Sequence, residues 1–229
     1  MLKKSQGIVL SYIRYQETSI IVRIFTRELG LKSYIVNGVR SAKGKPKMAL
    51  YQPLTILDLV VYDKESLSLN RISEAKLQHP FQKIPFDFIR SGIAMFVAEA
   101  ISKSIHEGYQ NEQLYDFLEQ ALKHLDGDSV KLALFPIIFL LEMSNYLGFA
   151  PSDAKSFFEE ILQEMKVPEL IQQEIQALDL LIVASFGCQE TIPSKTRKAL
   201  LDHLLIFYSQ HLEDHGAWKS VKVLRQLLL

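Results

Sequence analysis

Five short runs that are typical of β-strands fill the first 74 residues, and no long helical pattern interrupts them. Each run is rich in β-branched, aromatic or other apolar residues, as strands are. The predicted strands are residues 7–14, 18–26, 31–36, 54–62 and about 66–74. So few strands leave exposed edges unless the sheet closes on itself, and the pattern therefore favours a small barrel. The five-stranded OB-fold, which often binds oligonucleotides, is the favoured architecture, and an SH3-like barrel fits the number of strands as well.

The pattern changes at His79-Pro80, after which apolar residues recur at the spacing of helices. The first helix is expected to start near Asp87, whose side chain can cap it. Further helices are expected at about residues 111–124, 129–147, 153–165, 168–183, 193–212 and 217–228. Glycines fall between them, where helix ends are common. The chain is therefore predicted to form an OB-fold barrel over residues 1–79 and an all-α domain over residues 80–229.

Residues 36–47, between the third and fourth predicted strands, contain cations and no acid. The cations are Arg40, Lys43, Lys45 and Lys47. Gly38, Gly44 and Pro46 are expected to keep the segment out of regular structure. Long loops inside compact domains are often functional, and a purely cationic one favours contact with a polyanion. A solubilising surface loop is the plain alternative, and the segment alone does not decide between the two.

The formal charge of the whole chain is zero, but its two parts differ. Residues 1–80 hold 13 Lys and Arg against 6 Asp and Glu, a net charge of +7, and the remainder holds 13 against 20. A basic half of this kind indicates an acidic partner such as nucleic acid.

Cations interleaved with aromatic rings along an OB-fold are typical of single-strand binding, because the rings stack on bases while the cations contact phosphates. The predicted DNA-binding residues are Arg14, Arg23, Arg27, Lys32, Tyr34, Arg40, Lys43, Lys45 and Lys47. For any single tyrosine, including Tyr12, Tyr15 and Tyr51, packing inside the barrel is the more common role.

A second basic patch lies in the predicted helical domain, which is otherwise acidic. Its residues are Lys195, Arg197, Lys198, Lys219, Lys222 and Arg225. The last three are spaced so that they share roughly one face of a helix. The patch can balance neighbouring acids, or it can receive an acidic peptide.

Sequence motifs give catalysis no positive support. The chain has no glycine-rich phosphate loop, no Gly-x-Ser-x-Gly and no His-Glu-x-x-His. Cys188 is the single cysteine, so no intrachain disulfide can form, and it is expected to be a partly buried, inert thiol. His211 and His215 have the spacing of two metal ligands, but two ligands do not make a site. We therefore expect a protein that is not an enzyme and needs no cofactor.

The apolar runs are too short for a signal peptide or a membrane span. With no possible disulfide, this predicts a cytoplasmic protein without a membrane partner.

Short motifs along the chain form a recognisable series. In the predicted barrel they are Gly7-Ile8-Val9-Leu10, Tyr15-Gln16-Glu17-Thr18-Ser19, Phe25-Thr26-Arg27-Glu28-Leu29-Gly30, Asn37-Gly38-Val39-Arg40, Leu50-Tyr51-Gln52-Pro53-Leu54 and Ser73-Glu74-Ala75. In the helical part they are Leu147-Gly148-Phe149-Ala150-Pro151 and Trp218-Lys219-Ser220-Val221-Lys222-Val223-Leu224. In their order and spacing they resemble the RecO family of bacterial DNA repair proteins, over essentially the whole chain.

The resemblance implies a recombination mediator that binds single- and double-stranded DNA and anneals complementary strands. It implies work with RecR and with the single-stranded-DNA-binding protein, and an indirect effect on RecA, which is helped to load onto DNA. The location implied is the nucleoid within the cytoplasm. The resemblance gives Arg40 a direct DNA contact, and it makes the acidic C-terminal tail of the single-stranded-DNA-binding protein a candidate ligand of the second basic patch.

Many members of that family carry a four-cysteine zinc module after the motif at residues 147–151. Here Ser152-Asp153-Ala154 follows instead, so no structural zinc is expected. Two other interpretations stay open. One is a protein-interaction scaffold whose barrel binds a partner protein rather than DNA. The other is a nuclease, which would need a cluster of metal-binding carboxylates that the sequence does not reveal.

Overall fold

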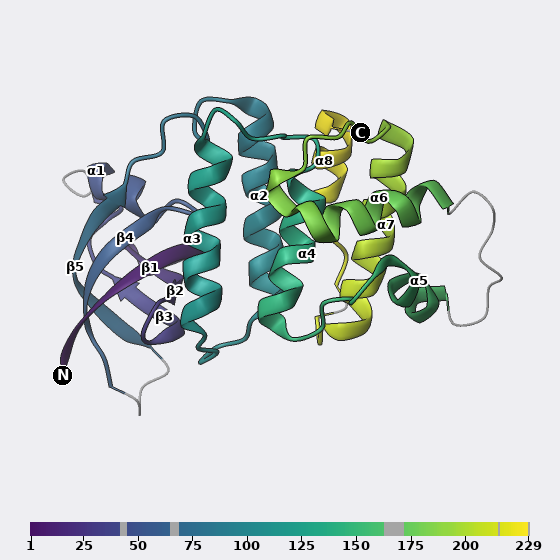
Figure 1. Cartoon of the computed structure of the whole chain (residues 1–229). Helices are drawn as coiled ribbons and strands as arrows, with labels where there is room; N and C mark the ends of the chain where they lie inside the picture. The colour runs from purple at the N-terminus through teal and green to yellow at the C-terminus, as the bar shows by residue number, and fades with distance from the viewer. Residues whose placement is uncertain (42–44, 65–68, 163–171, 215, 229) are drawn as a thin grey trace. The chain divides into compact units, whose positions relative to one another are not determined.

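The computed structural model describes residues 1–41, 45–64, 69–162, 172–214 and 216–228. Five strands form a closed barrel in the order β1-β2-β3-β5-β4, and β4 pairs back onto β1 (Figure 1). The strands are β1 (Leu2–Tyr15), β2 (Ser19–Thr26), β3 (Gly30–Val36), β4 (Ile56–Tyr62) and β5 (Asn70–His79). The predicted five-stranded barrel is thereby confirmed, although β1 starts earlier and β5 ends later than expected. The expected start of the fifth strand, residues 66–68, lies outside the described residues.

Four of the five strand pairings are antiparallel, and the fifth, between β3 and β5, is parallel and short. Antiparallel ladders join β1 to β2, β2 to β3, β4 to β5 and β1 to β4. β3 and β5 run parallel, and their register contains only the pairs Tyr34 with Asn70 and Ile35 with Arg71. Beyond Arg71, β5 keeps β4 on one side and has no further register with β3 on the other. The seam between β3 and β5 is therefore the weakest part of the barrel wall.

Alternation along each strand places apolar side chains inside the barrel, because successive residues point to opposite faces. In β2, Ile20, Val22 and Ile24 are fully buried, whereas Ile21 and Arg23 between them are only half-buried. The same core cluster includes Val9, Tyr34, Leu57, Leu59 and Val61. Side chains, rather than a channel, fill the interior.

The turn that joins β2 to β3 contacts a distant segment through its backbone. Gly30 has a φ of +73°, a conformation that favours glycine. The N–H of Leu31 donates to the carbonyl of Tyr109 at 2.8 Å, and the N–H of Gly108 donates to the carbonyl of Leu31 at 2.8 Å. A Cβ at position 30 would lie 2.4 Å from the Tyr109 carbonyl oxygen. Only glycine fits this approach.

Seven helices follow the barrel in the described part of the chain. They are α2 (Phe88–Ser104), α3 (Glu112–Asp126), α4 (Phe135–Leu147), α5 (Ala154–Leu162), α6 (Gln172–Ala184), α7 (Ser194–His211) and α8 (Val221–Leu228). This confirms the predicted all-α part, but α4 begins six residues after the predicted start at 129. Pro136 lies in its first turn, where proline is tolerated because the early N–H groups have no partner inside the helix. None of the described helices combines the length and apolar character needed to cross a bilayer.

Contacts divide the chain into two compact units, and the division does not follow a single cut. The first unit contains residues 1–82 and 101–123, and the second contains residues 83–100 and 124–229. In the first unit the ring of Phe25 lies 6.1 Å, centroid to centroid, from that of Tyr115 in α3. The predicted boundary after residue 79 assigned residues 101–123 to the helical domain, whereas their contacts group them with the barrel.

The second unit has its own core around α4, whose residues from 135 to 141 are all buried. The Tyr208 hydroxyl of α7 donates to the carbonyl of Leu140 at 2.7 Å, which satisfies a polar group in an apolar interior. Gly92 of α2 permits close packing with α8, because a Cβ there would lie 2.3 Å from Cδ1 of Leu227.

Candidate nucleic-acid interface

The first part of the predicted cationic loop is anchored to the turn between β1 and β2. The N–H of Arg40 donates to the carbonyl of Thr18 at 2.9 Å, and its guanidinium donates to the carbonyl of Gln16 at 3.1 Å. Val39 is buried beside them, and Gly38 has a φ of +72° where the chain turns. Arg40 is thus held in place by backbone contacts and stays half-exposed at one end of the barrel.

The second part of the loop is more regular than predicted. Residues Lys45–Met48 form a short helix, α1, and Ala49–Tyr51 form a 3-10 turn. Pro46 does not prevent the helix, because proline is compatible with a first helical turn. The side chain of Lys47 is exposed. Lys43 lies outside the described residues, and the position of the Lys45 side chain is not described.

Two tyrosines that were candidates for base stacking are interior residues. The side chain of Tyr34 is fully buried in the barrel, and burial raises the pKa of its phenol above the ordinary value, to which the charge of Asp63 adds. Tyr51 is 4% exposed, and burial raises the pKa of its phenol to about 12. Because neither ring offers a face to a base, Tyr34 does not belong to the interface. Tyr12 and Tyr15 are half-buried and keep part of their surface.

Two predicted cations are already neutralised within the first unit. Lys32 pairs with Asp63, whose side chain is 1% exposed and also receives Lys3 at 2.6 Å. Burial alone would raise the pKa of Asp63, but the hydrogen bonds from Lys3 and Lys32 outweigh it and hold that pKa below its ordinary value. Arg27 pairs with Asp116 at 2.7 Å. These cations hold the fold together and contribute less net charge to a surface.

Other predicted cations remain available. Arg14 is exposed near the end of β1, and Arg23 is half-buried on the outer face of β2. Within the described part of the chain, neither forms an ion pair. Arg23 therefore lies on the outer face of the barrel, whereas Arg14, which is opposite the buried Ile20, is exposed near the end of β1. The loop adds Arg40 and Lys47.

The barrel register brings together a row of residues that no local sequence pattern predicts. Ile13 lies opposite Ile21, Ile21 opposite Ile35, and Ile35 opposite Arg71, so the four share one outer face. Ile13 is 63% exposed and Arg71 is exposed. An apolar row that ends in a cation becomes visible only when the strands are in register, since its members come from four strands.

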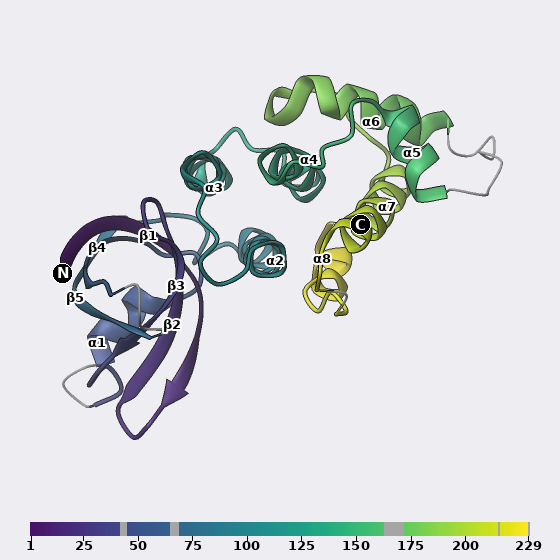
Figure 2. The ribbon, with the colours of Figure 1, turned by 90° about the horizontal axis from the view of Figure 1, so that it is seen from below.

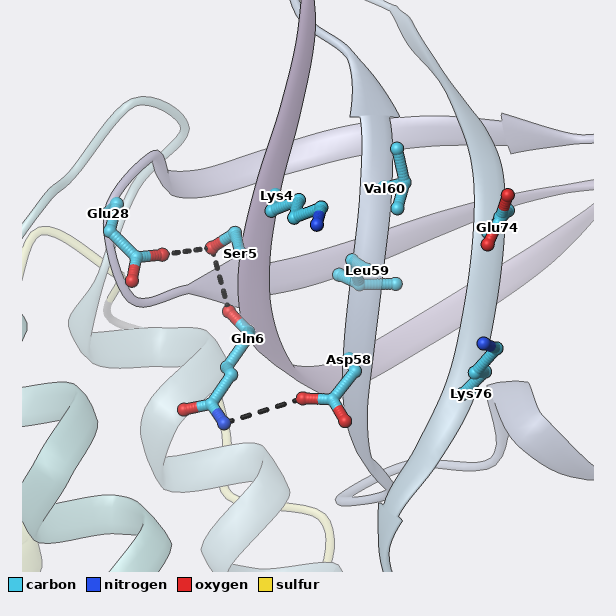
Figure 3. Close-up of a pocket in the computed structure, with 9 residues that line it drawn as sticks. All are labelled: Lys4, Ser5, Gln6, Glu28, Asp58, Leu59, Val60, Glu74 and Lys76. Atoms are coloured by element: carbon cyan, nitrogen blue, oxygen red, sulfur yellow. Dashed lines mark hydrogen bonds between the residues drawn. The ribbon is translucent and has the colours of Figure 1, made fainter.

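Two hollows on the barrel differ in charge. The first lies over β1, β4 and β5, and its ionic residues are Lys4, Lys76, Glu28, Asp58 and Glu74 (Figure 3). Acids therefore outnumber bases, and Gln6 lies 3.4 Å from a carboxylate oxygen of Asp58. The second hollow lies between β5 and the loop, and its ionic residues are Lys47, Arg71, Lys76 and Glu74. The second hollow, not the first, has the charge that suits a polyanion.

In the second unit, the predicted partner-binding cations fall into two groups. Arg197 donates to the carbonyls of Ile192 and Leu228, at 2.6 and 2.9 Å, and Arg225 pairs with Asp202. These two brace α7 against α8. The remaining four are exposed and form no ion pair with another described residue. Two lie in α7, one lies in α8 and one lies just before α8. The four are Lys195, Lys198, Lys219 and Lys222.

The residues after the motif at 147–151 do not fit a zinc module. Asp153 accepts a hydrogen bond from the N–H of Ser156 at 2.8 Å, so it acts as a cap at the start of α5. Over the described ranges, no three His, Cys, Asp or Glu side chains gather where they could hold a metal ion. Cys188 is buried, more completely than the partial burial that was predicted.

Comparisons with known proteins cover nearly the whole chain. A family model described as "Recombination protein O N terminal" matches residues 1–81, and one described as "Recombination protein O C terminal" matches residues 85–156. The chain is 38% identical to the DNA repair protein RecO of Flavobacterium psychrophilum, with 98% of each chain covered. It is 36% identical to the RecO protein of Flavobacterium johnsoniae over 98% of each chain, and 32% identical to that of Phocaeicola vulgatus over 99% of each.

Proposed function

The chain belongs to the RecO family of DNA repair proteins, and from this we propose that it is a recombination mediator that binds DNA and anneals complementary strands. The observation that carries the proposal is the set of cations on the barrel that no acid neutralises within the described residues. They include Arg14, Arg23, Lys47 and Arg71, beside the anchored Arg40. Phosphates are the partner that such a cluster suits.

Annealing follows from charge in this proposal. Two DNA strands repel each other, and a surface that contacts the phosphates of both lowers that repulsion while the bases stay free to pair. The apolar row of Ile13, Ile21 and Ile35 gives bases an aliphatic surface to pack against. Tyr34 cannot provide a stacking surface because its ring is buried.

Salt dependence tests the proposal most directly. The affinity for a short single strand is expected to fall steeply as salt rises, because binding releases counterions. We consider a variant in which Gln replaces all four loop cations, Arg40, Lys43, Lys45 and Lys47. Each phosphate contact on a single strand contributes about 0.7 to the slope of log affinity against log salt, so this variant should reduce the slope by about 3. An unchanged slope would contradict the role of the loop.

A charge-matched variant in the second unit serves as the control. Replacing Lys195, Lys198, Lys219 and Lys222 with Gln removes the same charge but leaves the barrel intact. This variant should keep the DNA affinity and the annealing rate of the native chain, while the loop variant anneals complementary strands more slowly.

We further propose that the four exposed lysines of the second unit receive the acidic C-terminal tail of the single-stranded-DNA-binding protein, and that the chain works with RecR so that RecA can load. The four-lysine variant should then lose affinity for a tail peptide, whereas the loop variant should keep it. Equal affinity of both variants for the peptide would reject this assignment. Action in the cytoplasm, at the nucleoid, belongs to the same proposal.

A scaffold that binds a partner protein through the barrel is the second candidate. The exposure of Ile13 on an apolar row favours it, since apolar surface is common at protein interfaces. Failure of the purified chain to bind an oligonucleotide at low salt would favour the scaffold over the mediator. Cleavage of DNA with added magnesium would instead favour a nuclease.

A further inference from the structure

The hollow between β5 and the loop exists because the parallel seam of the barrel ends early. After the pair Ile35 and Arg71, the chain leaves β3 and turns at Gly38, while β5 continues beside β4. The backbone of β5 after Arg71 therefore has a strand partner on one side only. Figure 2 shows α1 lying beside β5, and residues of both line the hollow, which has a volume of about 420 Å³.

A bulge in β5 lies at the hollow. Val61 is opposite Ile72, but Val60 is opposite Glu74, so Ser73 is an extra residue without a partner on β4. Bulges interrupt a ladder and redirect the backbone, and they are common beside binding sites. Ser73 is exposed and lines the hollow. Its N–H and C=O groups, with those of its neighbours on the unpaired side, can hydrogen-bond to a ligand.

The floor and the rim of the hollow differ in chemistry. The floor is apolar and includes Val36, Val39 and Tyr51, each at most 9% exposed. The rim has three exposed cations and one acid, and none of the cations forms an ion pair with another described residue. The cations are Lys47, Arg71 and Lys76. A flat apolar ligand that carries negative charge at one end matches this arrangement.

We propose that this hollow is a subsite for one unpaired nucleotide of single-stranded DNA. The base lies against the apolar floor and hydrogen-bonds to the open edge of β5 near Ser73, and its phosphates contact Arg71 and Lys47. A base inside a duplex cannot enter, because it would have to leave its stack and its partner. The subsite therefore distinguishes single strands from duplexes, which the outer cations do not. This inference rests on the proposed DNA binding and adds to it a place where a base, and not only a phosphate, is held.

The test compares two oligonucleotides of the same length by fluorescence anisotropy at fixed low salt. One is oligothymidylate, and the other has the same sugar-phosphate backbone but abasic sites throughout. The native chain should bind oligothymidylate about fivefold or more tightly, since contacts to a base face contribute measurably to single-strand binding. Phosphate contacts alone would give equal affinities.

Ser73→Trp is the variant that fills the hollow. Because Ser73 is exposed at a bulge, the added ring occupies the hollow without replacing a core residue. The variant should bind both oligonucleotides equally, at the affinity that the native chain has for the abasic one. Gln120→Trp adds the same ring on an exposed site of α3 and should leave the preference for oligothymidylate intact.

Arg71→Gln separates the phosphate contact from the base contact. It should weaken binding of both oligonucleotides by the same factor and keep the preference for bases, whereas Lys64→Gln, at an exposed cation outside the hollow, should have the smaller effect.

The possible outcomes are distinct. Equal affinity of the native chain for both oligonucleotides, or a preference that Ser73→Trp keeps, would overturn the subsite and leave the proposed DNA binding standing. An equal loss for both oligonucleotides in Ser73→Trp, with the preference retained, would likewise overturn it. Failure of the native chain to bind either oligonucleotide would overturn the proposed DNA binding and the subsite together.

Discussion

Arg27 and Asp116 form a forked ion pair, in which Nε donates to Oδ1 at 2.7 Å and Nη2 donates to Oδ2 at 3.0 Å. Glu112 adds a second carboxylate, whose oxygen lies 2.9 Å from Nη1. The hydrogen bond to Asp116 and the nearby acids raise the pKa of Arg27 above its ordinary value, against the opposing effect of desolvation. The pair joins the residue that follows β2 to α3, so it ties residues 101–123 to the barrel.

Arg27→Gln and Arg23→Gln are chemically identical changes, but they should affect different properties. Arg27→Gln should change local stability, and Arg23→Gln should change DNA binding. Loss of the ion pair in Arg27→Gln should speed hydrogen exchange in residues 112–123 and leave DNA affinity within about twofold. Arg23→Gln should leave exchange unchanged and lower the salt slope of single-strand binding by about 0.7. If both variants reduced the DNA affinity equally, Arg27 would have to contact DNA as Arg23 does.

Asp63→Asn should destabilise the first unit, because Lys3 and Lys32 would lose a buried carboxylate partner. We expect the free energy of unfolding at pH 7 to fall by about 2 kcal/mol, less than for a fully buried pair because both lysines reach solvent. Asp58→Asn, at an exposed position of β4, should change it by less than about 0.5 kcal/mol. Urea unfolding measures both, and similar values for the two variants would contradict the role of Asp63.

The pH dependence of the Asp63 effect has a definite sign. The pKa of Asp63 is lower in the folded than in the unfolded chain, so its stabilisation is present above the unfolded pKa of about 3.9. It is lost as the pH falls through the folded pKa. The difference between the native chain and Asp63→Asn should shrink in that acidic range.

His124 should make the second unit less stable in mild acid. It lies against the rings of Phe135 and Phe186, and its burial lowers the pKa of the imidazole. The stabilisation from a neutral His124 is present above the unfolded pKa of about 6.5 and is lost as the pH falls through the lower folded pKa. His124→Phe cannot take up a proton, so its thermal midpoint should fall less between pH 7.5 and 5.5, taken as about one unit on either side of the unfolded pKa. Parallel curves would contradict the prediction.

Gly30→Ala and Gly38→Ala separate close packing from backbone strain. Both glycines have nearly the same φ, +73° and +72°, but a Cβ at Gly38 would meet no atom within 4 Å. Gly38→Ala should destabilise the chain by about 1 kcal/mol through strain alone. Gly30→Ala should cost about 2 kcal/mol more, because the Tyr109 carbonyl must move. Equal unfolding midpoints would show that the segment around Tyr109 yields without cost.

Local patterns were enough to predict the barrel and the helices, because alternation and helical spacing follow from burial of one face. The same alternation, counted from Val36 back through Tyr34, also places Tyr34 on the inner face. That signal could have removed Tyr34 from the predicted interface. Tyr34 was included because aromatic residues alternate with cations in this region, but its position along the strand determines that its side chain points inward.

Which cations are free could not be predicted in the same way. Arg23 and Arg27 look alike in sequence, but the partner of Arg27 is 89 positions away in α3. A helix pattern shows that α3 has an apolar face without showing which surface that face covers. The hollow beside β5 also depends on register, since Arg71 and Lys47 line the same hollow only because the parallel seam ends there.

The barrel register also has a consequence for the order of folding. The β1–β2, β2–β3 and β4–β5 ladders join neighbours in sequence, whereas β1–β4 pairs Leu2 with Tyr62 and β3–β5 pairs Tyr34 with Asn70. Closing long loops costs more chain entropy, so local hairpins form before distant strands meet. We expect a three-strand meander and a β4–β5 hairpin to assemble separately and to dock late. The two-pair seam at Tyr34 and Ile35 should then be the last part of the barrel to gain protection during refolding.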